Sequence, residues 1–533
     1  MVENKQNQLL KGAFILTLAG LISKVLSALY RIPLQNLTGD YGYYVYQQIY
    51  PFIGMLMMLS LYGFPAAVSK LTSEQQANNK DLSFKKFTQP ILIILFSFSL
   101  SLAAIMFGLA PYLTNLVGDE KLIASYQLVS LGFLLIPLTS FYRGYFQGIG
   151  DMKPTAYSQV FEQLFRVSII VVVAFLISRN FFDTYALGVW SVYATLFSGV
   201  IGTIVLYIFK IKKPKEIFEQ VKSKVPWRYF IKVLFLFGII AALNHMILLL
   251  LQFADVFTLV PYLIDSGYAE IEAMEMKGIF DRGQPLIQFG AVLGSSFALA
   301  LIPEITSRKK EWKEKTLQTI KDTLTISFYI AAGATLGLIF ILPEANILLF
   351  EDKSGTKSLQ ILMFAILFGS IAVTSNAILQ SYGYYKEITM FIVSMFFAKI
   401  ILNYLFVPKL GIIGSSFATT LSLLILTIFS LSFLKLKLTK TSFVKMINWR
   451  AFIYGSISMV SFLLITQYFL GNYFIQSRFM LLIYVMIIVG IGGGIYLLVL
   501  LRYDALSKRQ LKAFPLTNII FKLQQIAKFK KER

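Results

Sequence analysis

The chain has 533 residues, of which 57% are hydrophobic and only 14% are charged. A water-soluble domain of this size needs more polar surface, so the composition excludes a soluble globular protein and favours one whose solvent is lipid. Cysteine is absent from the sequence, which excludes disulfides and every metal or iron–sulfur site that depends on cysteine.

Apolar runs of about twenty residues recur along the whole chain, and each is long enough to cross a hydrocarbon core of about 30 Å as a helix. Runs such as 169–177 and 481–501 are apolar on all faces, which favours helices over barrel strands. The polar N-terminus leads into the first run without a signal-peptide cleavage site, so we expect that span to be retained. We predict an all-α integral membrane protein with about fourteen transmembrane helices, at 11–30, 43–66, 89–109, 122–147, 155–178, 185–209, 229–255, 285–304, 322–343, 358–381, 387–406, 411–433, 449–469 and 479–501.

The basic residues are distributed unevenly between the loops. Most of the 49 Lys and Arg lie on alternate loops and at the two termini, whereas the other loops are acidic or neutral. The longest acidic loop is expected at 256–283. By the positive-inside rule the basic side faces the cytoplasm, which places both termini there. This distribution explains the net charge of +22 without a nucleic-acid partner.

A short pattern indicates an internal duplication. Gln-x-x-Gly-x-x-Lys follows the fourth span at 147–153 and recurs after the tenth span at 380–386, and the same offset aligns Arg166 with Lys399. We predict two six-helix lobes of the same orientation, the parallel-repeat arrangement of some alternating-access transporters. The expected divisions are 1–215 for the N-terminal lobe, 216–440 for the C-terminal lobe, 441–501 for the last two spans and 502–533 for a basic cytoplasmic tail.

Charged side chains within the spans are candidates for a transport path, because each costs several kcal/mol unless it faces protein or water. Cations predominate among them, and a cavity that they line would attract an anion such as a diphosphate, which suits Arg and Lys geometry. The substrate-binding candidates are Lys24, Arg31, Arg166, Arg282 and Lys399. The supporting or coupling candidates are Glu162, Asn244, Asp255 and Asn403.

Several of these residues have two interpretations. Glu162 and Arg166 are one turn apart, so they either neutralise each other or line the cavity. Arg282 lies at the expected outer mouth, as an interfacial anchor or as a ligand contact. Lys24 is about 20 Å along the helix from Lys11, which favours the cavity over an escape of its ammonium to the interface.

The driving force is also open. Asp255 is a candidate for binding a coupling proton or cation, whereas Lys399 suggests a tethered ammonium in place of a bound sodium ion. His245 is the only histidine, so no histidine cluster for a metal exists. No nucleotide-binding or catalytic motif is present, and the glycine cluster at 490–494 is typical of close helix packing. We expect no enzymatic site, metal or cofactor, and leave Na⁺, H⁺ or the membrane potential as the driver.

Three stretches of the chain resemble polysaccharide biosynthesis proteins. They are LISKVLSALYRIPL at 21–34, GDYGYYVYQQIYP at 39–51 and RGYFQGIGDMKPTA at 143–156. Proteins of this kind form the stage V sporulation protein B-like branch of the multidrug/oligosaccharidyl-lipid/polysaccharide (MOP) flippase superfamily, which includes the lipid II flippases. The resemblance implies a V-shaped, MATE-like arrangement of two six-helix lobes plus two C-terminal helices that form a groove for a lipid tail.

Individual residues can be compared with the cavity arginines of the related lipid II flippases. Lys24 stands in Ser-Lys-Val-Leu where the family has Ser-Arg-Val-Leu, Arg31 lies one place from the next cationic position, and Asp281-Arg282 matches the Asp-Arg that opens the eighth span. The second span departs from the pattern, because 50–67 holds no Arg or Lys. One expected cation is therefore missing, which leaves lipid II as one substrate among several.

The sequence thus predicts a flippase of the bacterial plasma membrane that moves a lipid-linked prenyl-diphosphate glycan or cell-wall precursor by alternating access. Its expected partners are that precursor, membrane lipids and enzymes of envelope synthesis, and a monomer is expected. Two alternatives remain. One is a cation-coupled multidrug exporter, and the other is a non-transporting scaffold for envelope synthesis.

Overall fold

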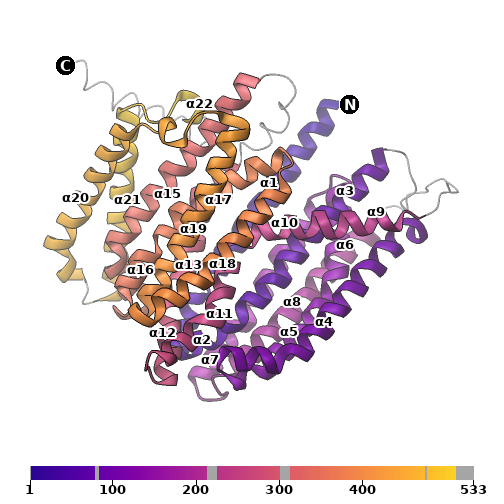
Figure 1. Cartoon of the computed structure of the whole chain (residues 1–533), viewed down its shortest axis with the longest axis horizontal. Coiled ribbons are helices and arrows are strands. Elements are labelled where there is room, and N and C mark those ends of the chain that lie inside the picture. The colour runs from indigo at the N-terminus through magenta and orange to yellow at the C-terminus, as the bar shows by residue number, and fades with distance from the viewer. Residues whose placement is uncertain (1, 78–82, 213–224, 300–312, 475–476, 512–533) are drawn as a thin grey trace. The chain divides into compact units, whose positions relative to one another are not determined.

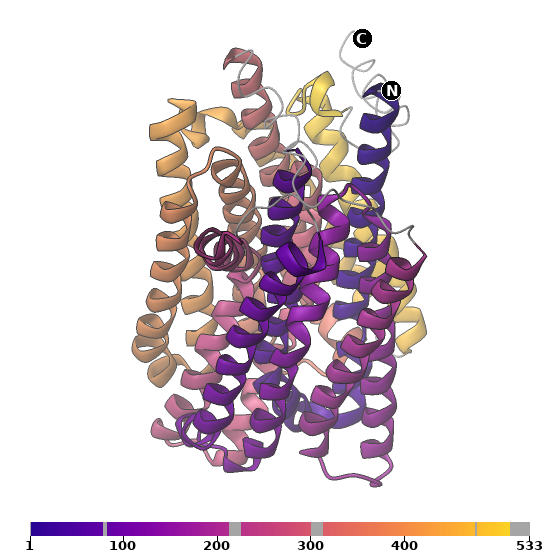
Figure 2. The same ribbon diagram turned by 90° about the vertical axis from the view of Figure 1, so that its right-hand side faces the viewer.

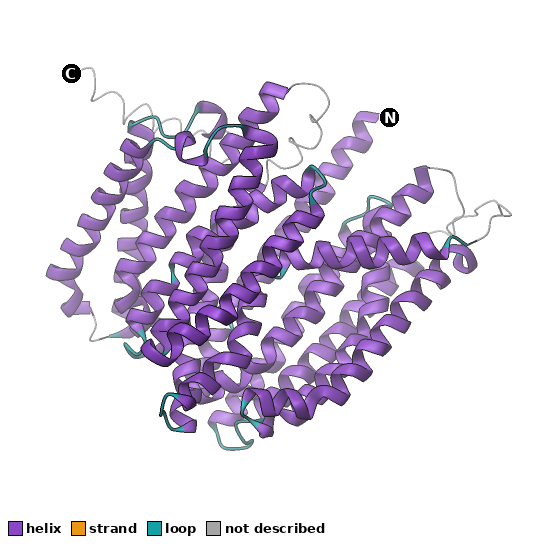
Figure 3. Cartoon of the chain, in the orientation of Figure 1, coloured by secondary structure: helices purple, strands orange, loops and turns teal. Residues whose placement is uncertain are grey.

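The computed structural model describes residues 2–77, 83–212, 225–299, 313–474 and 477–511. Helices joined by short loops make up these ranges, in which no strand occurs (Figure 3). Thirteen helical stretches in the described ranges are long and apolar enough to cross a membrane. The all-helical membrane fold predicted from the sequence is confirmed.

The chain divides into two compact units, residues 1–281 and 282–533. The helices of the first unit are α1 (Val2–Leu29), α2 (Arg31–Met58), α3 (Phe64–Ala77), α4 (Gln89–Val117), α5 (Ile123–Gly132), α6 (Ile136–Gly148), α7 (Lys153–Ser178), α8 (Ala186–Ile211), α9 (Trp227–Lys232), α10 (Gly238–His245), α11 (Ile247–Asp265) and α12 (Glu270–Asp281) (Figure 1). The helices of the second unit are α13 (Gly283–Leu299), α15 (Lys313–Phe350), α16 (Thr356–Leu362), α17 (Phe364–Ser381), α18 (Tyr385–Leu410), α19 (Ile412–Leu434), α20 (Trp449–Phe474), α21 (Arg478–Arg502) and α22 (Lys508–Leu511).

The first, second and seventh predicted spans differ from the structure. The first two form one helical stretch, 18–77, which is broken at Gly39, where φ is 69°. The seventh, 229–255, is wrong as a single helix, because α10 ends at His245 and α11 begins at Ile247. The stretch from α9 to α10 runs across the other helices of its unit, lengthwise in Figure 1 and end-on in Figure 2. The eighth span corresponds to α13, 17 residues long as described.

The acidic loop expected at 256–283 is instead largely helical. Helix α11 continues to Asp265, and α12 follows after a short turn. Because α9 to α12 group with the first unit, the division between units falls at 281, whereas the lobes were expected to divide at 215. The four-part division of the chain stays a prediction, and the tail from 512 onward lies outside the described residues.

The duplicated pattern adopts the same turn in both units. Gly150 and Gly383 have φ of 82° and 91°, a conformation that favours glycine. Each glycine amide donates to the carbonyl oxygen of the glutamine three residues earlier, at 3.0 Å from Gly150 to Gln147 and 2.9 Å from Gly383 to Gln380. These turns end α6 and α17, and the next helices are α7 and α18. The repeat inferred from the sequence is therefore present in the local structure of each unit.

One glycine permits a close approach of α12 to α2. A Cβ atom on Gly278 would lie 2.1 Å from the carbonyl oxygen of Asp40, far inside van der Waals contact. Helices α2 and α12 pack against each other. The contact holds Lys277 and Asp281, which are both buried, against α2.

We predict that Gly278→Ala destabilises the protein by about 1–3 kcal/mol, because the added methyl group has no room against a backbone carbonyl. The matched control is Gly108→Ala in α4, where a Cβ atom meets nothing within 4 Å. That control should stabilise slightly, by up to about 1 kcal/mol, through helix propensity. Thermal unfolding of the full chain in detergent, at one scan rate, measures both. Equal shifts in the two variants would contradict the close approach.

Candidate functional site

Arg31 lies in a cage of tyrosines at the start of α2. Its guanidinium group is fully buried and lies 4.0 Å from the centroid of the Tyr50 ring. Tyr30, Tyr43 and Tyr46 also surround it closely enough to act on its charge. Spacings of three and four residues place Tyr43, Tyr46 and Tyr50 on one face of α2, and the Tyr30 and Tyr46 hydroxyls hydrogen-bond each other.

The guanidinium of Arg31 has no hydrogen-bond partner within the described part of the chain. This holds for Nε, Nη1 and Nη2 alike. A buried cation without hydrogen bonds is costly, and the ring contact with Tyr50 compensates only part of that cost. The guanidinium thus carries five N–H donors for which the described residues supply no acceptor.

Lys24 lies two helical turns before Arg31, about 10 Å along the axis. Its side chain is exposed on the surface of the first unit. It lies near enough to His245 to interact electrostatically, and the His245 ring stacks on Tyr62 with 4.1 Å between ring centroids. Of the five predicted cations, Lys24 is thus accessible, and Arg31 is buried in the tyrosine cage.

Glu162 pairs with an arginine that the sequence analysis did not select. Arg143 of α6 is fully buried, and its Nη2 donates to Glu162 Oε2 at 2.6 Å. The same guanidinium donates to the Ser158 hydroxyl and to the Ser60 carbonyl oxygen, each at 3.1 Å. Arg166, the expected partner one turn away, instead donates to Gln163. Glu162 is therefore paired across helices with Arg143, and not with Arg166 as one of the two expectations had it, because spacing along one helix does not reveal contacts between helices.

A second pair of buried charges lies beside the tyrosine cage. Lys277 Nζ donates to Asp281 Oδ2 at 2.6 Å, and both residues are buried. Burial raises the pKa of the Asp281 carboxyl above its ordinary value, and the Lys277 ammonium opposes that rise. Asp255 and Arg31 also act on this carboxyl, so three buried charged residues of the first unit surround it. Sequence analysis missed Lys277 because it placed that segment in an external loop.

Asn244 and Gln252 add unused hydrogen-bonding groups to the first unit. Both atoms of each side-chain amide are buried and lack a partner in the portion of the chain that the structure describes. They lie on either side of the break at Met246, in α10 and α11. Asn244 was expected from the sequence, whereas Gln252 was not among the predicted site residues.

Arg282 opens the second unit and is held by a carboxylate. Its Nη1 and Nη2 donate to the two oxygens of Asp352 at 2.7 and 2.8 Å, a bidentate pair. The Arg282 side chain is fully buried, while that of Asp352 is 44% exposed. Burial acts to raise the pKa of Asp352, but the Arg282 hydrogen bonds and charge lower it below its ordinary value. In this conformation Arg282 anchors the loop after α15.

Lys399 is also held by its own unit. Its ammonium donates to Asn403 Oδ1 at 3.0 Å, to the Ser415 carbonyl and hydroxyl at 3.0 and 2.9 Å, and to the Thr419 hydroxyl at 2.8 Å. These four oxygens are uncharged and come from α18 and α19. Arg282 and Lys399 lie in a different unit from Lys24 and Arg31, so a single cavity lined by all of them stays a prediction. Within the described residues, no cluster of three or more His, Cys, Asp or Glu could hold a metal ion.

An apolar groove of about 360 Å³ runs along α15 in the second unit. Aliphatic, aromatic and glycine residues of α13, α15, α20 and α21 form its wall. It follows α15 from Ile326 to Ile341, about 22 Å at 1.5 Å per residue. The glycines that line it are Gly290, Gly333, Gly337, Gly492 and Gly493. Gly493 has open space where a Cβ atom would lie, so part of the glycine cluster shapes this groove instead of bringing helices together.

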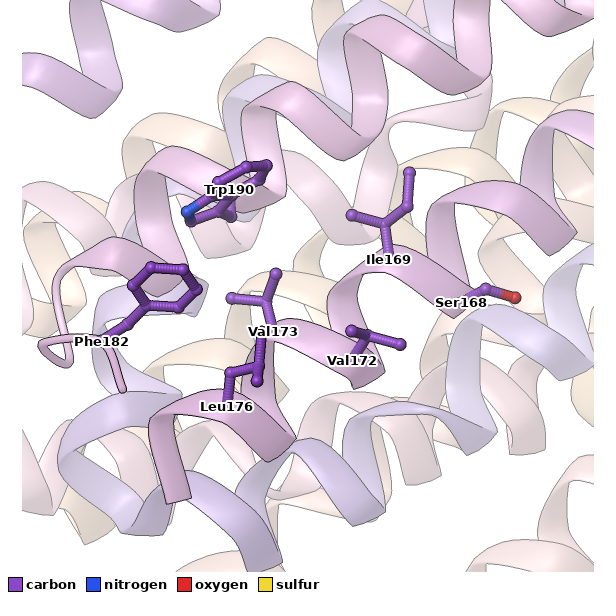
Figure 4. A pocket seen from close by; sticks show the side chains of 7 residues that line it. All are labelled: Ser168, Ile169, Val172, Val173, Leu176, Phe182 and Trp190. Atoms are coloured by element: carbon purple, nitrogen blue, oxygen red, sulfur yellow. The ribbon is translucent and has the colours of Figure 1, made fainter. Parts of the chain in front are cut away.

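A second recess, of about 340 Å³, lies between α7 and α8. Its wall is made of Ile169, Val172, Val173, Leu176, Phe182 and Trp190, with Ser168 at one edge (Figure 4). The Ser168 hydroxyl points away from Trp190 (Figure 4). An apolar recess of this kind is an ordinary surface for lipid chains, and we assign it no role.

The family model described as "Polysaccharide biosynthesis protein" matches residues 9–309. The membrane protein YabM of Bacillus subtilis (strain 168), described as uncharacterized, is 36% identical over 424 residues, 78% of this chain and 78% of that protein. The lipid II flippase MurJ of the same organism is 27% identical over 437 residues, 78% of this chain and 80% of that protein.

Two solved structures share the fold. The lipid II flippase MurJ in an inward closed conformation superposes with a TM-score of 0.66 at 14% identity, covering 91% of this chain and 98% of that one. An inward-facing multidrug resistance MATE family transporter of the MOP superfamily gives a TM-score of 0.61 at 16% identity, covering 79% and 96%. At these identities the likeness concerns the fold alone.

We predict that Asp352→Asn destabilises the protein by about 1–3 kcal/mol, because it removes the negative charge that the buried Arg282 guanidinium binds bidentately. The matched control is Glu351→Gln, the adjacent acid, whose ion pair with Arg478 is exposed and is worth about 0–1 kcal/mol. Thermal unfolding in detergent measures both. The wild-type contribution is fully present above about pH 4, the ordinary range for Asp, and is lost as the pH falls through the lowered pKa. Equal stability of the two variants would show that the Arg282 pair is no anchor.

Proposed function

Because the chain belongs to the polysaccharide biosynthesis protein family, we propose that it moves a lipid-linked glycan precursor, with a prenyl diphosphate as the link, across the bacterial plasma membrane. The observation that carries this proposal is Arg31, a buried guanidinium whose three nitrogens have no hydrogen-bond partner in the described residues. The protein is a transporter in this proposal and performs no covalent chemistry.

The head group is recognised by charge and by hydrogen bonds. A diphosphate offers several anionic oxygens, and a guanidinium binds two of them in parallel. Arg31 supplies this pair of donors within the tyrosine cage, and Lys24, seven residues earlier in the chain, supplies an accessible second charge. The site therefore selects an anion over the cationic compounds that many drug exporters carry.

The prenyl chain is accommodated by the apolar groove of the second unit. The groove covers about 22 Å of α15, a large part of the hydrocarbon thickness of about 30 Å. Its wall of aliphatic, aromatic and glycine residues suits an unbranched or methyl-branched hydrocarbon chain. A prenyl diphosphate combines in one molecule the two chemistries that the units offer separately.

Transport proceeds by alternating access between the two faces of the membrane. The head group shifts the equilibrium between the two access states only if it binds them with different affinities. Arg31 provides such a difference if the head group binds its guanidinium in only one of the two states. Lipid II is one precursor of this class, and a teichoic-acid-type prenyl diphosphate is another. The missing cation in 50–67 favours testing both.

Drug export is the principal alternative, since the fold is shared with a multidrug resistance transporter. It predicts altered drug susceptibility in a deletion strain, with normal transfer of lipid-linked glycans in liposomes. A scaffold role predicts that protein in which both Arg31 and Lys24 are replaced still restores envelope synthesis. The exporter, scaffold and flippase proposals therefore predict different results for drug susceptibility, for transfer of lipid-linked glycans and for envelope synthesis.

We predict that Arg31→Gln and Lys24→Ala each slow the transfer of the lipid-linked precursor across liposome membranes by roughly tenfold to a hundredfold. This factor corresponds to the free energy of one hydrogen bond to a charged group. Purified lipid II and a teichoic-acid-type prenyl diphosphate are each tested. The matched control is Arg179→Gln, an exposed arginine of the same unit that stacks on Phe175. Unchanged thermal stability of Arg31→Gln would exclude misfolding as the cause. Normal transfer of both lipids by both variants would rule out the cation site.

We also predict that transport needs no sodium ion, because the Lys399 ammonium already occupies a position ringed by four neutral oxygens. Replacement of Na⁺ by choline should leave wild-type transfer unchanged. Lys399→Ala should lower thermal stability, and Na⁺ should restore part of it where choline does not. Lys409→Ala, an exposed lysine of the same helix, is the control. A wild-type requirement for Na⁺ would refute this role of Lys399.

A further inference from the structure

Glu344 of α15 is a buried acid to which the proposed transport path assigns no role. The residue is 5% exposed. Its two carboxylate oxygens each accept a hydrogen bond from Gln467 Nε2 of α20, at 2.6 Å. No basic side chain of the described residues lies within ion-pair distance of it. A carboxylate in this setting is held by a neutral amide, without a counter-charge.

The pair lies just beyond one end of the apolar groove. The groove ends at Ile341 on α15 and at Leu463 on α20. Glu344 follows Ile341 by three residues, and Gln467 follows Leu463 by four, so each lies on the groove-facing side of its helix one turn further on. The Gln467 amide also donates to the Phe340 carbonyl oxygen at 3.2 Å. Gln467 therefore fastens α20 to α15 at the end of the groove that is predicted to face outward.

The surroundings of Glu344 contain few charges. Lys353, in the loop after α15, acts on it electrostatically. From α21, the titratable group facing it is Tyr484. The Arg478 and Glu351 pair lies at the same end of the unit but is exposed and bonded to each other. A proton is therefore the simplest species that can change the charge at this point.

We propose that Glu344 is a proton-binding site whose protonation releases α20 from α15 and opens the outer end of the apolar groove. This inference rests on the proposed function only for the identity of the chain that the groove holds. Deprotonated, the carboxylate accepts a charge-assisted hydrogen bond that the Gln467 amide shares between both carboxylate oxygens, while the second N–H of that amide is directed at the Phe340 carbonyl oxygen; this is the stronger arrangement. The protonated carboxyl keeps one carbonyl oxygen as an acceptor, and its hydroxyl oxygen is a weaker acceptor. The hydrogen bonding between Glu344 and Gln467 therefore weakens. Opening is thus favoured at low pH.

The test uses the absence of native cysteine. Spin labels at Tyr468→Cys, 81% exposed on α20, and at Ser354→Cys report the distance between α20 and the end of α15. Ser354 is tied to α15 because Asn346 donates to its carbonyl oxygen at 2.8 Å. Pulsed electron paramagnetic resonance on the full chain in lipid nanodiscs, without substrate, gives the distance distribution between about pH 5 and pH 9, a range that covers buried carboxyls.

We expect a longer-distance population that grows roughly tenfold from high to low pH, the factor that separates a charged from a neutral hydrogen bond. In Glu344→Gln that population should be present at every pH. Gln467→Leu, which changes no charge, should give the same pH-independent result and serves if the first variant fails to fold. Glu351→Gln, the exposed acid nearby, should keep the wild-type response.

A wild-type distribution that does not change with pH, or a pH response that survives in Glu344→Gln, would overturn the proposal. Since the measurement needs no substrate, that outcome leaves the proposed transport function standing. Loss of transfer in the Arg31 and Lys24 variants bears only on transport, and a failure there leaves the proton site standing.

Discussion

Charged groups inside an apolar solvent must be compensated locally, and this constraint organises the protein. Each buried charge described here meets it in a different way. Arg143 has a carboxylate and two neutral oxygens, Arg282 has a bidentate carboxylate, and Lys399 has four neutral oxygens. Arg31 has tyrosine rings, and its donors find no acceptor among the residues that the structure describes. Compensation by the chain indicates a fixed structural role, and incomplete compensation marks the place for a ligand.

The two units use polar and apolar surfaces for different purposes. The first unit gathers Arg31, Lys277, Asp255 and Asp281 in one buried region, together with amides that have hydrogen-bonding capacity to spare. The second unit offers a hydrocarbon-lined groove with a titratable group just beyond one end. An amphiphile with a charged head and a long tail matches this division. Neither surface alone would distinguish such a molecule from a simple anion or a simple lipid.

Hydropathy predicted the helical class and most spans, because an apolar run of about twenty residues has few other folds available in lipid. The family resemblance from three short stretches is confirmed by the match over 9–309. The Gln-x-x-Gly pattern predicted a duplication, and its two copies adopt the same turn because glycine is favoured where φ is positive. The helix break at Met246 was missed because no Pro or Gly marks it, and the helical 270–281 segment was missed because its acids resemble a solvated loop.

Site residues were predictable as buried charges but not as partners. Spacing along one helix suggested Glu162 with Arg166, whereas Arg143 reaches Glu162 from α6. Lys277 lies in a segment that was expected to be an external loop exposed to water. The burial of Arg282 and Lys399 within their own unit depends on tertiary contacts. Partner choice between helices is set by packing geometry, which a single sequence does not display.

The glycines along the groove have a consequence for how the protein can change. At Gly337 and Gly493 the space beside the backbone is open, and a methyl group there would narrow the channel without striking another atom. At Gly333 the Tyr496 ring already fills that space, 2.6 Å from where a Cβ atom would lie. Single-nucleotide substitutions of glycine by alanine can therefore narrow the groove at Gly337 and Gly493, whereas at Gly333 the added methyl group would clash with Tyr496. The width of the groove is in this sense adjustable independently of the fold.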